Sequence, residues 1–262
     1  KIKKKIIEII YFFLNFKKKR QIFKQTYKCK LLSSKSFIFF ANQFNKDLRS
    51  STKFFIRDNT YKNSFSDLDI YYVGADALED FVSQTNNYKN KFILITGDSD
   101  RTIKKNLDVY KTLNKNKKLI NWYSQNCTNP NKKITQIPIG LDYISQFHDS
   151  HTFRLKVNNR KLLPLSYEKK IVKILKKAPD FKFRNNLIFC NYQFSLKSSD
   201  RIECFNLVSK NLCFYLKKRI PYLENFQKQS RFKFVLAPSG EGIDTHRVWE
   251  AILLGNIPIV KS

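Results

Sequence analysis

The chain has 262 residues, of which 42% are hydrophobic and 15% aromatic, so it can bury a sizeable core and is not intrinsically disordered. Its formal net charge of +29 favours an acidic partner, such as a nucleic acid, an anionic lipid or a phosphorylated small molecule. Lysine far outnumbers arginine, and this bias is also typical of an AT-rich genome, which would supply charge without function.

The first predicted element is an apolar run at 6–16, between two basic clusters. The run is too short to span a bilayer and contains Glu8 and Asn15. It fits either an amphipathic helix lying on a membrane surface or the first helix of the fold. We therefore predict a separate basic and apolar segment over 1–30, with peripheral membrane contact as one hypothesis.

Short β-prone runs follow, and their spacing is typical of βα units in a parallel sheet. The predicted strands are 36–41, 69–73, 91–96, 119–123 and 134–139, with a helix over 76–84. Functional residues belong at the carboxyl ends of such strands. Polar residues occupy these places at Asp98, Asp100, Gln125, Asn126 and Asp142. The sequence thus predicts a first Rossmann-like lobe over 31–160.

A lysine-rich stretch at 150–180, which carries Pro164 and Pro179, is the predicted link to a second lobe over 161–262. A helix is predicted over 167–177. Strands are predicted at 186–192, 213–216, 232–236 and 257–260. The fold class expected is α/β, with two Rossmann-like lobes built on parallel sheets. Because the sequence stops straight after a strand, the second lobe is expected to be incomplete at its C-terminus.

The five cysteines include no Cys-x-x-Cys pair, so neither a zinc site nor a disulfide framework is indicated. No cluster of histidines with metal-ligand spacing accompanies them. Free thiols in a reducing compartment are the simplest interpretation. This predicts a cytoplasmic protein, with membrane association through the N-terminal segment as an addition.

The stretch 230–260 carries the strongest functional signal, because it reads as strand, loop, helix, turn and strand. Pro238, Gly240 and Gly242 interrupt the first strand. Asp244 or Thr245 is predicted to cap the helix, and Gly255 to end it in a left-handed conformation.

The polar residues of that helix share one face, since His246, Arg247 and Glu250 span an arc of about 100°. A glycine loop that leads into a helix N-terminus suits an anion. Arg247 adds a cation that can fork onto phosphate, and Glu250 can accept hydrogen bonds from sugar hydroxyls. The pattern predicts a nucleoside-diphosphate-sugar site formed by Gly240, Glu241, Gly242 and this helix face. A solvated surface helix is the alternative.

This stretch resembles the donor-binding segment of exostosin-like glycosyltransferases. The matching residues are Pro238, Gly240, Gly242, Arg247, Glu250, Ala251, Gly255, Ile257 and Pro258. A second segment, 92–143, also resembles exostosin-like proteins of microbes and large viruses, through 92–100, 122–126 and 137–143.

The resemblance implies a two-lobe, GT-B-like transferase that moves a sugar from a nucleotide donor, expected to be a uridine nucleotide, to a glycan hydroxyl with inversion. It implies no metal and no further cofactor, and no nucleic-acid partner. It also places Arg201, on the helix after strand 187–191, near the donor. The general base is left open among Asp98, Asp100 and Asp142.

Three alternatives remain at this point. Asp98-Ser99-Asp100 matches the Asp-x-Asp that holds Mn²⁺ or Mg²⁺ in single-domain glycosyltransferases, because hard cations prefer paired carboxylates. The net charge is compatible with a basic nucleic-acid-binding protein, although no nucleic-acid-binding motif is present. A relative that binds a nucleotide sugar without turnover is the third.

Overall fold

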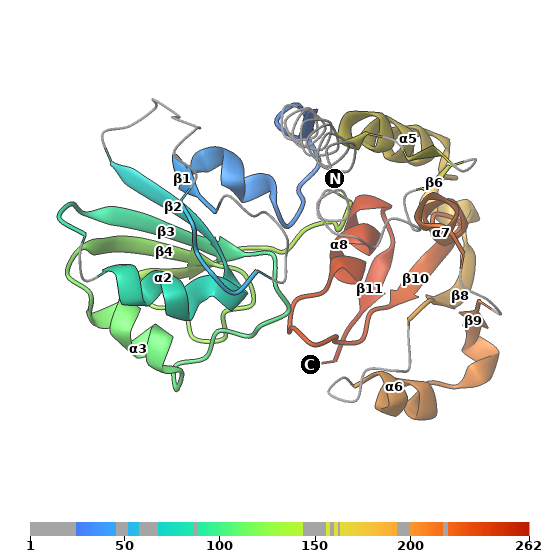
Figure 1. Cartoon of the computed structure of the whole chain (residues 1–262). Coiled ribbons are helices and arrows are strands. Elements are labelled where there is room, and N and C mark those ends of the chain that lie inside the picture. Colours follow the sequence, from blue (N-terminus) through green and yellow to red (C-terminus); the bar gives the residue numbers. More distant parts are fainter. Residues whose placement is uncertain are drawn as a thin grey trace, which may run out of the picture.

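The computed structural model describes residues 25–45, 52–57, 68–85, 88–143, 156–157, 160–161, 163–192, 200–216 and 220–261. Two separate parallel sheets, one of five strands and one of four, lie side by side with helices against them (Figure 1). This confirms the predicted α/β class with two Rossmann-like lobes. The predicted apolar run at 6–16 lies outside the described residues.

The first sheet has its five strands in the order in which they occur along the chain, and all neighbours are parallel. They are β1 (Gln43–Phe44), β2 (Asp69–Gly74), β3 (Phe92–Gly97), β4 (Leu119–Ser124) and β5 (Ile134–Gln136). Crossovers of a single hand place successive helices on the same face of a sheet with this order. Accordingly α2 (Leu78–Thr85) and α3 (Asp108–Lys115) both cover one face, after the short 3-10 helix η2 (Ala75–Ala77).

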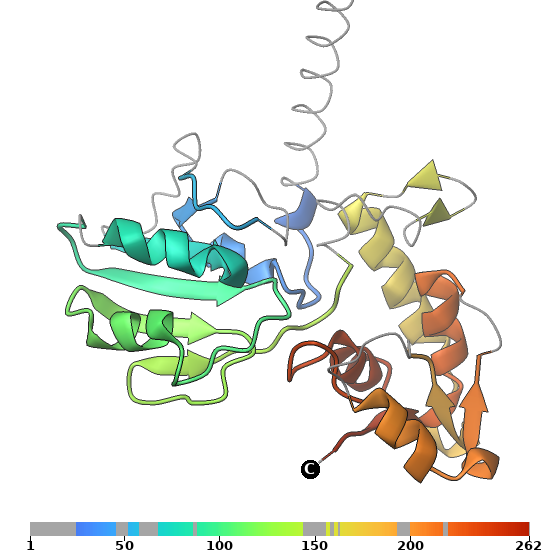
Figure 2. The ribbon, with the colours of Figure 1, turned by 60° about the horizontal axis from the view of Figure 1, so that its bottom comes forward.

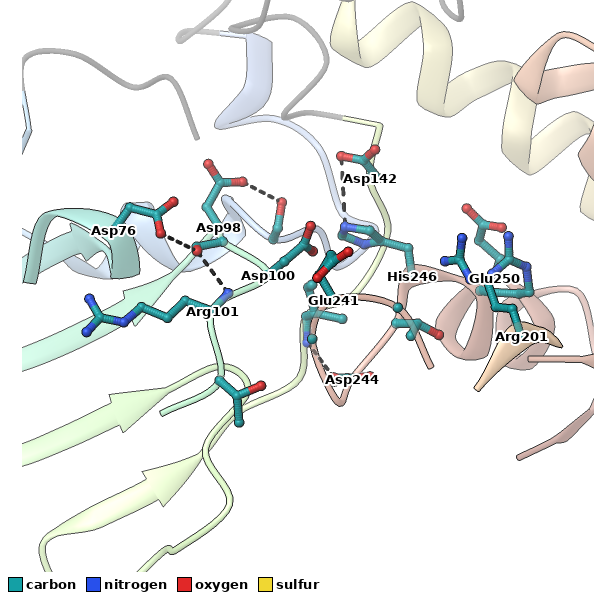
Figure 3. A pocket seen from close by; sticks show the side chains of 18 of the residues that line it. Asp76, Asp98, Asp100, Arg101, Asp142, Arg201, Glu241, Asp244, His246 and Glu250 are labelled. Atoms are coloured by element: carbon teal, nitrogen blue, oxygen red, sulfur yellow. Dashed lines mark hydrogen bonds and ion pairs between the residues drawn. The ribbon is translucent and has the colours of Figure 1, made fainter. Parts of the chain in front are cut away.

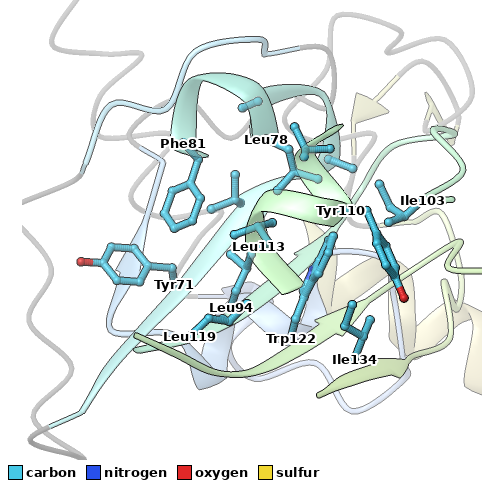
Figure 4. Packing of buried hydrophobic residues seen from close by; sticks show 14 of the residues in the cluster. Tyr71, Leu78, Phe81, Leu94, Ile103, Tyr110, Leu113, Leu119, Trp122 and Ile134 are labelled. Atoms are coloured by element: carbon cyan, nitrogen blue, oxygen red, sulfur yellow. The ribbon is translucent and has the colours of Figure 1, made fainter. Parts of the chain in front are cut away.

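The main core of the first lobe lies between these helices and the sheet (Figure 4). Leu94 and Trp122, on adjacent strands, and Phe81 and Leu113, on the two helices, are completely buried. Successive residues of a strand point to opposite faces of the sheet. On the face away from α2 and α3, Tyr72 and Ile95 pack against Phe44. The sheet is therefore covered on both faces, as parallel sheets are.

The prediction of a strand at 36–41 is wrong, because this run forms the 3-10 helix η1 (Ser36–Phe40). The Ser36 hydroxyl accepts the Ser33 N–H at 2.8 Å, and the Ser33 carbonyl accepts the Ser36 N–H at 2.8 Å. This serine turn bends the chain, and Phe37 and Phe39 then pack on the face of the sheet that lies away from α2 and α3. Local hydrogen bonding thus overrides the β propensity of the aromatic run. The first strand of the sheet follows as β1.

The second sheet has the parallel order β11-β10-β8-β9. Its strands are β8 (Asn185–Cys190), β9 (Cys213–Tyr215), β10 (Phe232–Leu236) and β11 (Ile257–Ile259). The chain moves outward from β8 to β9 and then returns to the other side of β8 to form β10. The gap between the carboxyl ends of β8 and β10 is consequently a topological switch point, the place where open α/β sheets bind ligands.

The described residues of this half form the α-helices α5 (Pro164–Lys177), α6 (Arg201–Leu207), α7 (Tyr222–Gln229) and α8 (His246–Leu253). Helices α5 and α7 lie against each other (Figure 2). The Tyr167 and Tyr222 rings stack between them with their centroids 6.0 Å apart. Two short 3-10 helices, η4 (Phe181–Phe183) and η5 (Lys210–Leu212), lead into β8 and β9. Gly255 ends α8 with φ of +68°, as predicted.

Two chain segments pass between the lobes side by side. Ser33 pairs with Leu141 in a parallel bridge, and the Leu141 N–H donates to the Leu32 carbonyl at 2.9 Å. Gly140, with φ of +67°, lies so close that a Cβ would come within 2.8 Å of the Leu32 carbonyl oxygen. These pairings fix both crossings to each other, so they set the position of one lobe relative to the other.

A buried carboxylate ties the N-terminal crossing to the second lobe. Glu168 on α5 accepts the backbone N–H groups of Lys30 and Leu31 at 2.8 and 2.9 Å, together with the Tyr143 hydroxyl at 2.6 Å. Along the sequence, the antiparallel pair β6 (Lys156–Val157) and β7 (Arg160–Lys161) comes between the strands of the two sheets, just before α5. No helix in the described ranges has the length and apolar character needed to cross a bilayer.

Candidate functional site

A cleft of about 810 Å³ separates the carboxyl ends of the two sheets (Figure 3). Every residue that the sequence predicted for catalysis or donor binding lines it. From the first half these are Asp98, Asp100 and Asp142, and from the second half Arg201, Gly240, Glu241, Gly242, His246, Arg247 and Glu250. The carboxyl-end rule accounts for this convergence, because loops after β3, β8 and β10 meet at the cleft.

Asp98 follows β3 and is held inside the first lobe. It is 7% exposed, it forms a buried ion pair with Lys35, and it accepts the Ser34 hydroxyl at 3.0 Å. Its backbone adopts φ of +55°, and its N–H donates to the Gln125 side chain at 2.8 Å. Of the three candidate bases, this carboxylate is the one already bound by a cation, so its role is to hold the turn after β3.

We expect Asp98→Asn to lower the free energy of unfolding by about 3 kcal/mol, because it leaves the Lys35 ammonium buried without its carboxylate. Urea denaturation checks this. The matched control is Asp108→Asn, which removes an exposed carboxylate paired with Lys111 and should cost less than about 0.5 kcal/mol. Equal losses in the two variants would contradict the structural role of the Asp98 pair.

Asp100, two residues further, is in a different environment. Its side chain is exposed at the cleft (Figure 3), and within the described part of the chain it has no hydrogen bond or ion pair. Partial burial of the carboxyl raises its pKa, and the nearby Asp142 and Glu241 raise it further, against an opposing effect of His246. A carboxylate with a raised pKa that faces a cleft is suited to accept a proton.

Asp142 and His246 join the two halves of the cleft. The His246 Nε2 lies 3.9 Å from an Asp142 oxygen, and its Nδ1 lies 2.7 Å from the Gly140 carbonyl oxygen, which requires that nitrogen to carry the proton. Burial acts to lower the pKa of His246, but Asp142, the Gly140 carbonyl and Glu250 outweigh it, so the pKa is raised. The ring is therefore poised to carry positive charge towards the first lobe.

Arg247 and Glu250 lie on the cleft side of α8, as their helical spacing predicted. The Arg247 Nε and one terminal nitrogen both donate to the Asn191 carbonyl, at 3.0 and 2.7 Å. Burial lowers the pKa of Arg247 to about 10, so the guanidinium remains charged at pH 7. Burial raises the pKa of Glu250, and Arg247 only partly offsets that effect.

Arg201 is the first residue of α6 and is 8% exposed. Its Nε donates to the Ser239 carbonyl at 3.2 Å, which joins the start of α6 to the loop after β10. Burial lowers its pKa, while Asp100 acts in the opposite direction from across the cleft. Arg201 follows β8 and Arg247 follows β10, so the two guanidinium groups stand on either side of the switch point.

The loop before α8 is anchored to the first lobe. Asn126, buried at the end of β4 with φ of +51°, donates to the Ser99 carbonyl at 3.0 Å and accepts the Asp244 N–H at 2.9 Å. Gly242 packs against the same amide, where a Cβ would come within 2.8 Å of the Asn126 nitrogen. One asparagine thus connects the turn that carries Asp100 to the glycine loop of the second lobe.

Asp244 does not cap α8. Thr245 is the N-cap and makes no side-chain capping bond. The Asp244 carboxylate instead accepts the Ile139 N–H at 2.9 Å and the Trp249 indole N–H at 2.8 Å. The first bond crosses between the lobes and the second stays within the second lobe.

We expect Asp244→Ala to weaken binding of the nucleotide predicted from the sequence about 10-fold, because it removes the side-chain bond to Ile139 that helps to hold the glycine loop to the first lobe. Trp249→Phe, the matched control, removes the bond within the second lobe and keeps the one to Ile139, so it should bind nucleotide nearly as well as the unaltered protein. Titration calorimetry measures both. Equal weakening in the two variants would show that the bond between the lobes contributes nothing.

Sequence reasoning missed several further lining residues, among them the charged and aromatic residues Asp76, Arg101, Tyr222 and Asp244. Asp76 lies at the start of the helix predicted over 76–84 and was not assigned to the site, although it follows β2 and obeys the carboxyl-end rule; it accepts the Ser99 hydroxyl at 3.0 Å. Arg101 forms a two-bond ion pair with Glu79, in which one nitrogen donates at 2.6 Å. Nothing in the sequence signals that pair, because it joins the first turn of α2 to the loop after β3.

The described residues include no group of three or more His, Cys, Asp or Glu side chains placed to hold a metal ion. A buried hydroxyl, that of Thr245, lines the cleft without a hydrogen-bond partner among the described residues. No protein-family profile and no curated protein sequence matches the chain. The geometry of this cleft is therefore the main guide to function.

Proposed function

We propose that the chain is a glycosyltransferase that moves a sugar from a nucleoside-diphosphate donor to a hydroxyl acceptor, expected to be a glycan. The observation that carries the proposal is that two fixed cations and two cleft-facing carboxylates meet across one cleft. Arg201 and Arg247 flank the switch point of the second sheet, and Asp100 and Asp142 face them from the first half. Such a cleft can bind a diphosphate on one wall and deprotonate an acceptor on the other.

The wall formed by the second lobe suits a diphosphate for three physical reasons. The N-terminus of α8 carries partial positive charge and unpaired N–H groups. Arg201 and Arg247 supply two fixed cations, and their carbonyl partners orient both guanidinium groups. Gly240 lacks a side chain, and a Cβ there would lie 3.4 Å from an Arg201 guanidinium nitrogen, so a phosphate can approach the backbone beside that cation.

Glu250, one turn further along α8, is proposed to accept hydrogen bonds from the ribose or the donor sugar. The unpartnered Thr245 hydroxyl is available for the same ligand. The resemblance to exostosin-like enzymes favours uridine and inversion, and both are part of the proposal.

The proposed reaction needs only one proton acceptor. Asp100 removes the proton from the acceptor hydroxyl as its oxygen forms the new bond to the anomeric carbon. The bond from that carbon to the diphosphate oxygen breaks, and the electron pair leaves with the diphosphate. Arg201, Arg247 and the helix N-terminus stabilise the negative charge that develops there. Asp142 orients His246, and together with the Gly140 carbonyl it raises the pKa of the imidazole against the effect of burial, which favours a positive charge between the two walls.

The metal-dependent alternative would use Asp98 and Asp100 as paired ligands. Asp98 already forms an ion pair with Lys35 and accepts a hydroxyl, so a metal would have to displace an internal cation. This argument supports donor binding without a divalent metal. The five cysteines carry free thiols, which supports the proposal of a cytoplasmic location.

Calorimetric titration of the full chain with UDP, GDP and their sugars, with and without EDTA, tests the proposal. We expect one nucleotide to bind in both conditions. Binding that disappears with EDTA and in Asp98→Ala would favour the metal-dependent alternative. A folded sample that binds no nucleotide in either condition would overturn the glycosyltransferase proposal.

A further inference from the structure

Helix α5 presents a stripe of lysines to solvent. From residue 169 to the end of the helix, all of its fully exposed residues are lysines: Lys169, Lys170, Lys173, Lys176 and Lys177. They span an arc of about 120° and a length of about 12 Å. None of these side chains forms an ion pair with a described residue, and the helix's one acidic residue, Glu168, is buried on the opposite side.

Exposed apolar side chains stand next to the end of this stripe. Phe181 and Phe183, in η4 just beyond α5, are 42% and 74% exposed. Leu212, immediately before β9, is 53% exposed, and Ile257, the first residue of β11, is 47% exposed. The strands of a parallel sheet all begin at the same end of the sheet. The residues at the starts of β8, β9 and β11 therefore lie along one amino-terminal edge of the second sheet, formed by the first residues of its strands.

Basic side chains are interleaved with these apolar ones. Lys182 lies between the two phenylalanines in sequence, with its ammonium 4.8 Å from the Phe183 ring centroid. Lys233 approaches the Phe181 ring at 5.6 Å, and Arg231, just before β10, is exposed. We call the lysine stripe and this edge together the basal surface.

We propose that the basal surface docks the protein on an anionic lipid membrane. Each lysine near a negatively charged leaflet strengthens binding about five-fold. Partly exposed aromatic and aliphatic side chains add an apolar contribution when they enter the interface. This inference goes beyond the proposed reaction and does not depend on it.

The apolar residues favour lipid over nucleic acid. Phosphate contacts to DNA or RNA would use the lysines equally well. Aromatic rings also stack on single-stranded bases, but the aliphatic side chains of Leu212 and Ile257 can neither stack on a base nor bind a phosphate. An acyl-chain interface uses all four apolar side chains.

The position of the basal surface agrees with a working enzyme. Its apolar part lies at the amino ends of the second sheet's strands, whereas the cleft lies at their carboxyl ends. Docking through this surface therefore leaves the cleft open to solvent. The chain beyond residue 25 enters the fold beside α5, because Cys29 and Leu31 pack in the same cluster as Ile171.

Co-sedimentation of the full chain with vesicles tests the proposal, at about 150 mM salt. Vesicles of phosphatidylcholine with about a third phosphatidylserine should bind the protein, and pure phosphatidylcholine vesicles should bind it far less. The variant Lys170→Gln/Lys173→Gln/Lys177→Gln should lose roughly 100-fold in affinity. Phe183→Ser should lose affinity as well, and its loss should persist at higher salt.

The matched control is Lys104→Gln/Lys117→Gln/Lys132→Gln, which removes the same charge from exposed positions in the first lobe. It should bind vesicles almost as the unaltered protein does. Equal losses in the two triple variants would overturn the proposal, since net charge alone would then explain binding. Tighter binding to polyuridylate RNA than to the anionic vesicles, lost in the α5 variant, would assign the basal surface to nucleic acid instead.

Discussion

Replacement of Arg247 by alanine should lower the affinity for the bound nucleotide roughly 100-fold, because a charged hydrogen bond to a diphosphate disappears from a buried site. Arg247 stands at the switch point of the second sheet and keeps its charge at pH 7, since its lowered pKa is about 10. Its two bonds to the Asn191 carbonyl fix the direction in which the guanidinium points. The loss should be the same with and without EDTA. Titration calorimetry measures it.

Arg231→Ala is the matched control for this prediction. Arg231 is exposed and immediately precedes β10, at the amino ends of the strands and therefore at the far end of the sheet from the cleft. Its loss should leave the nucleotide affinity unchanged. Arg247→Lys retains the positive charge but loses the paired N–H donors of the guanidinium. We expect its nucleotide affinity to lie between those of the unaltered protein and Arg247→Ala. A thermal unfolding midpoint close to that of the unaltered protein would show that Arg247→Ala is folded. Unchanged affinity in the folded Arg247→Ala variant would contradict the proposal that the diphosphate binds to the second-lobe side of the cleft.

Most strands of the fold are predictable from the sequence because they are continuous apolar runs bounded by turn residues. β3 and β10 are clear examples, and both lie within a residue of their predicted bounds. The run at 36–41 fails because a serine turn, a contact between residues three apart, decides its conformation. Helix α3 was not predicted, since its eight residues contain only a few apolar positions, among them Val109 and Leu113.

The order of the strands could not be predicted from periodicity. Neither the sequential order of the first sheet nor the switch between β8 and β10 leaves a local pattern, because both follow from which strand edges meet. The carboxyl-end rule nevertheless selected residues that line one cleft without that order. It needs only the strand ends and a parallel sheet, and both were available.

Within the site, the sequence located the residues and left their roles open. Asp98, Asp100 and Asp142 were equivalent candidates for the base. The contacts that distinguish them come from distant parts of the chain, such as Lys35 for Asp98 and His246 for Asp142. Asn126 was expected near the site, but its contact with Asp244 depends on how the lobes face each other.

The second prediction concerns the base. Asp100→Asn should lower the turnover of sugar transfer by about 10²- to 10⁴-fold, because the amide cannot accept the proton of the acceptor hydroxyl. The affinity for the nucleotide should change little, since Asp100 belongs to the opposite wall. Steady-state kinetics of donor consumption and calorimetry of nucleotide binding together measure the two quantities.

The pH dependence provides a separate readout. A general base must be deprotonated, so turnover falls as the pH drops through its pKa. Burial and the neighbouring carboxylates raise the pKa of Asp100, so the fall should occur at a higher pH than for an ordinary aspartate. Asp142→Asn should shift this limb to lower pH through the loss of a nearby negative charge and should retain most of the turnover. If Asp142→Asn abolishes turnover and Asp100→Asn does not, the base is Asp142, and Asp100 contributes only to the electrostatic potential around Asp142.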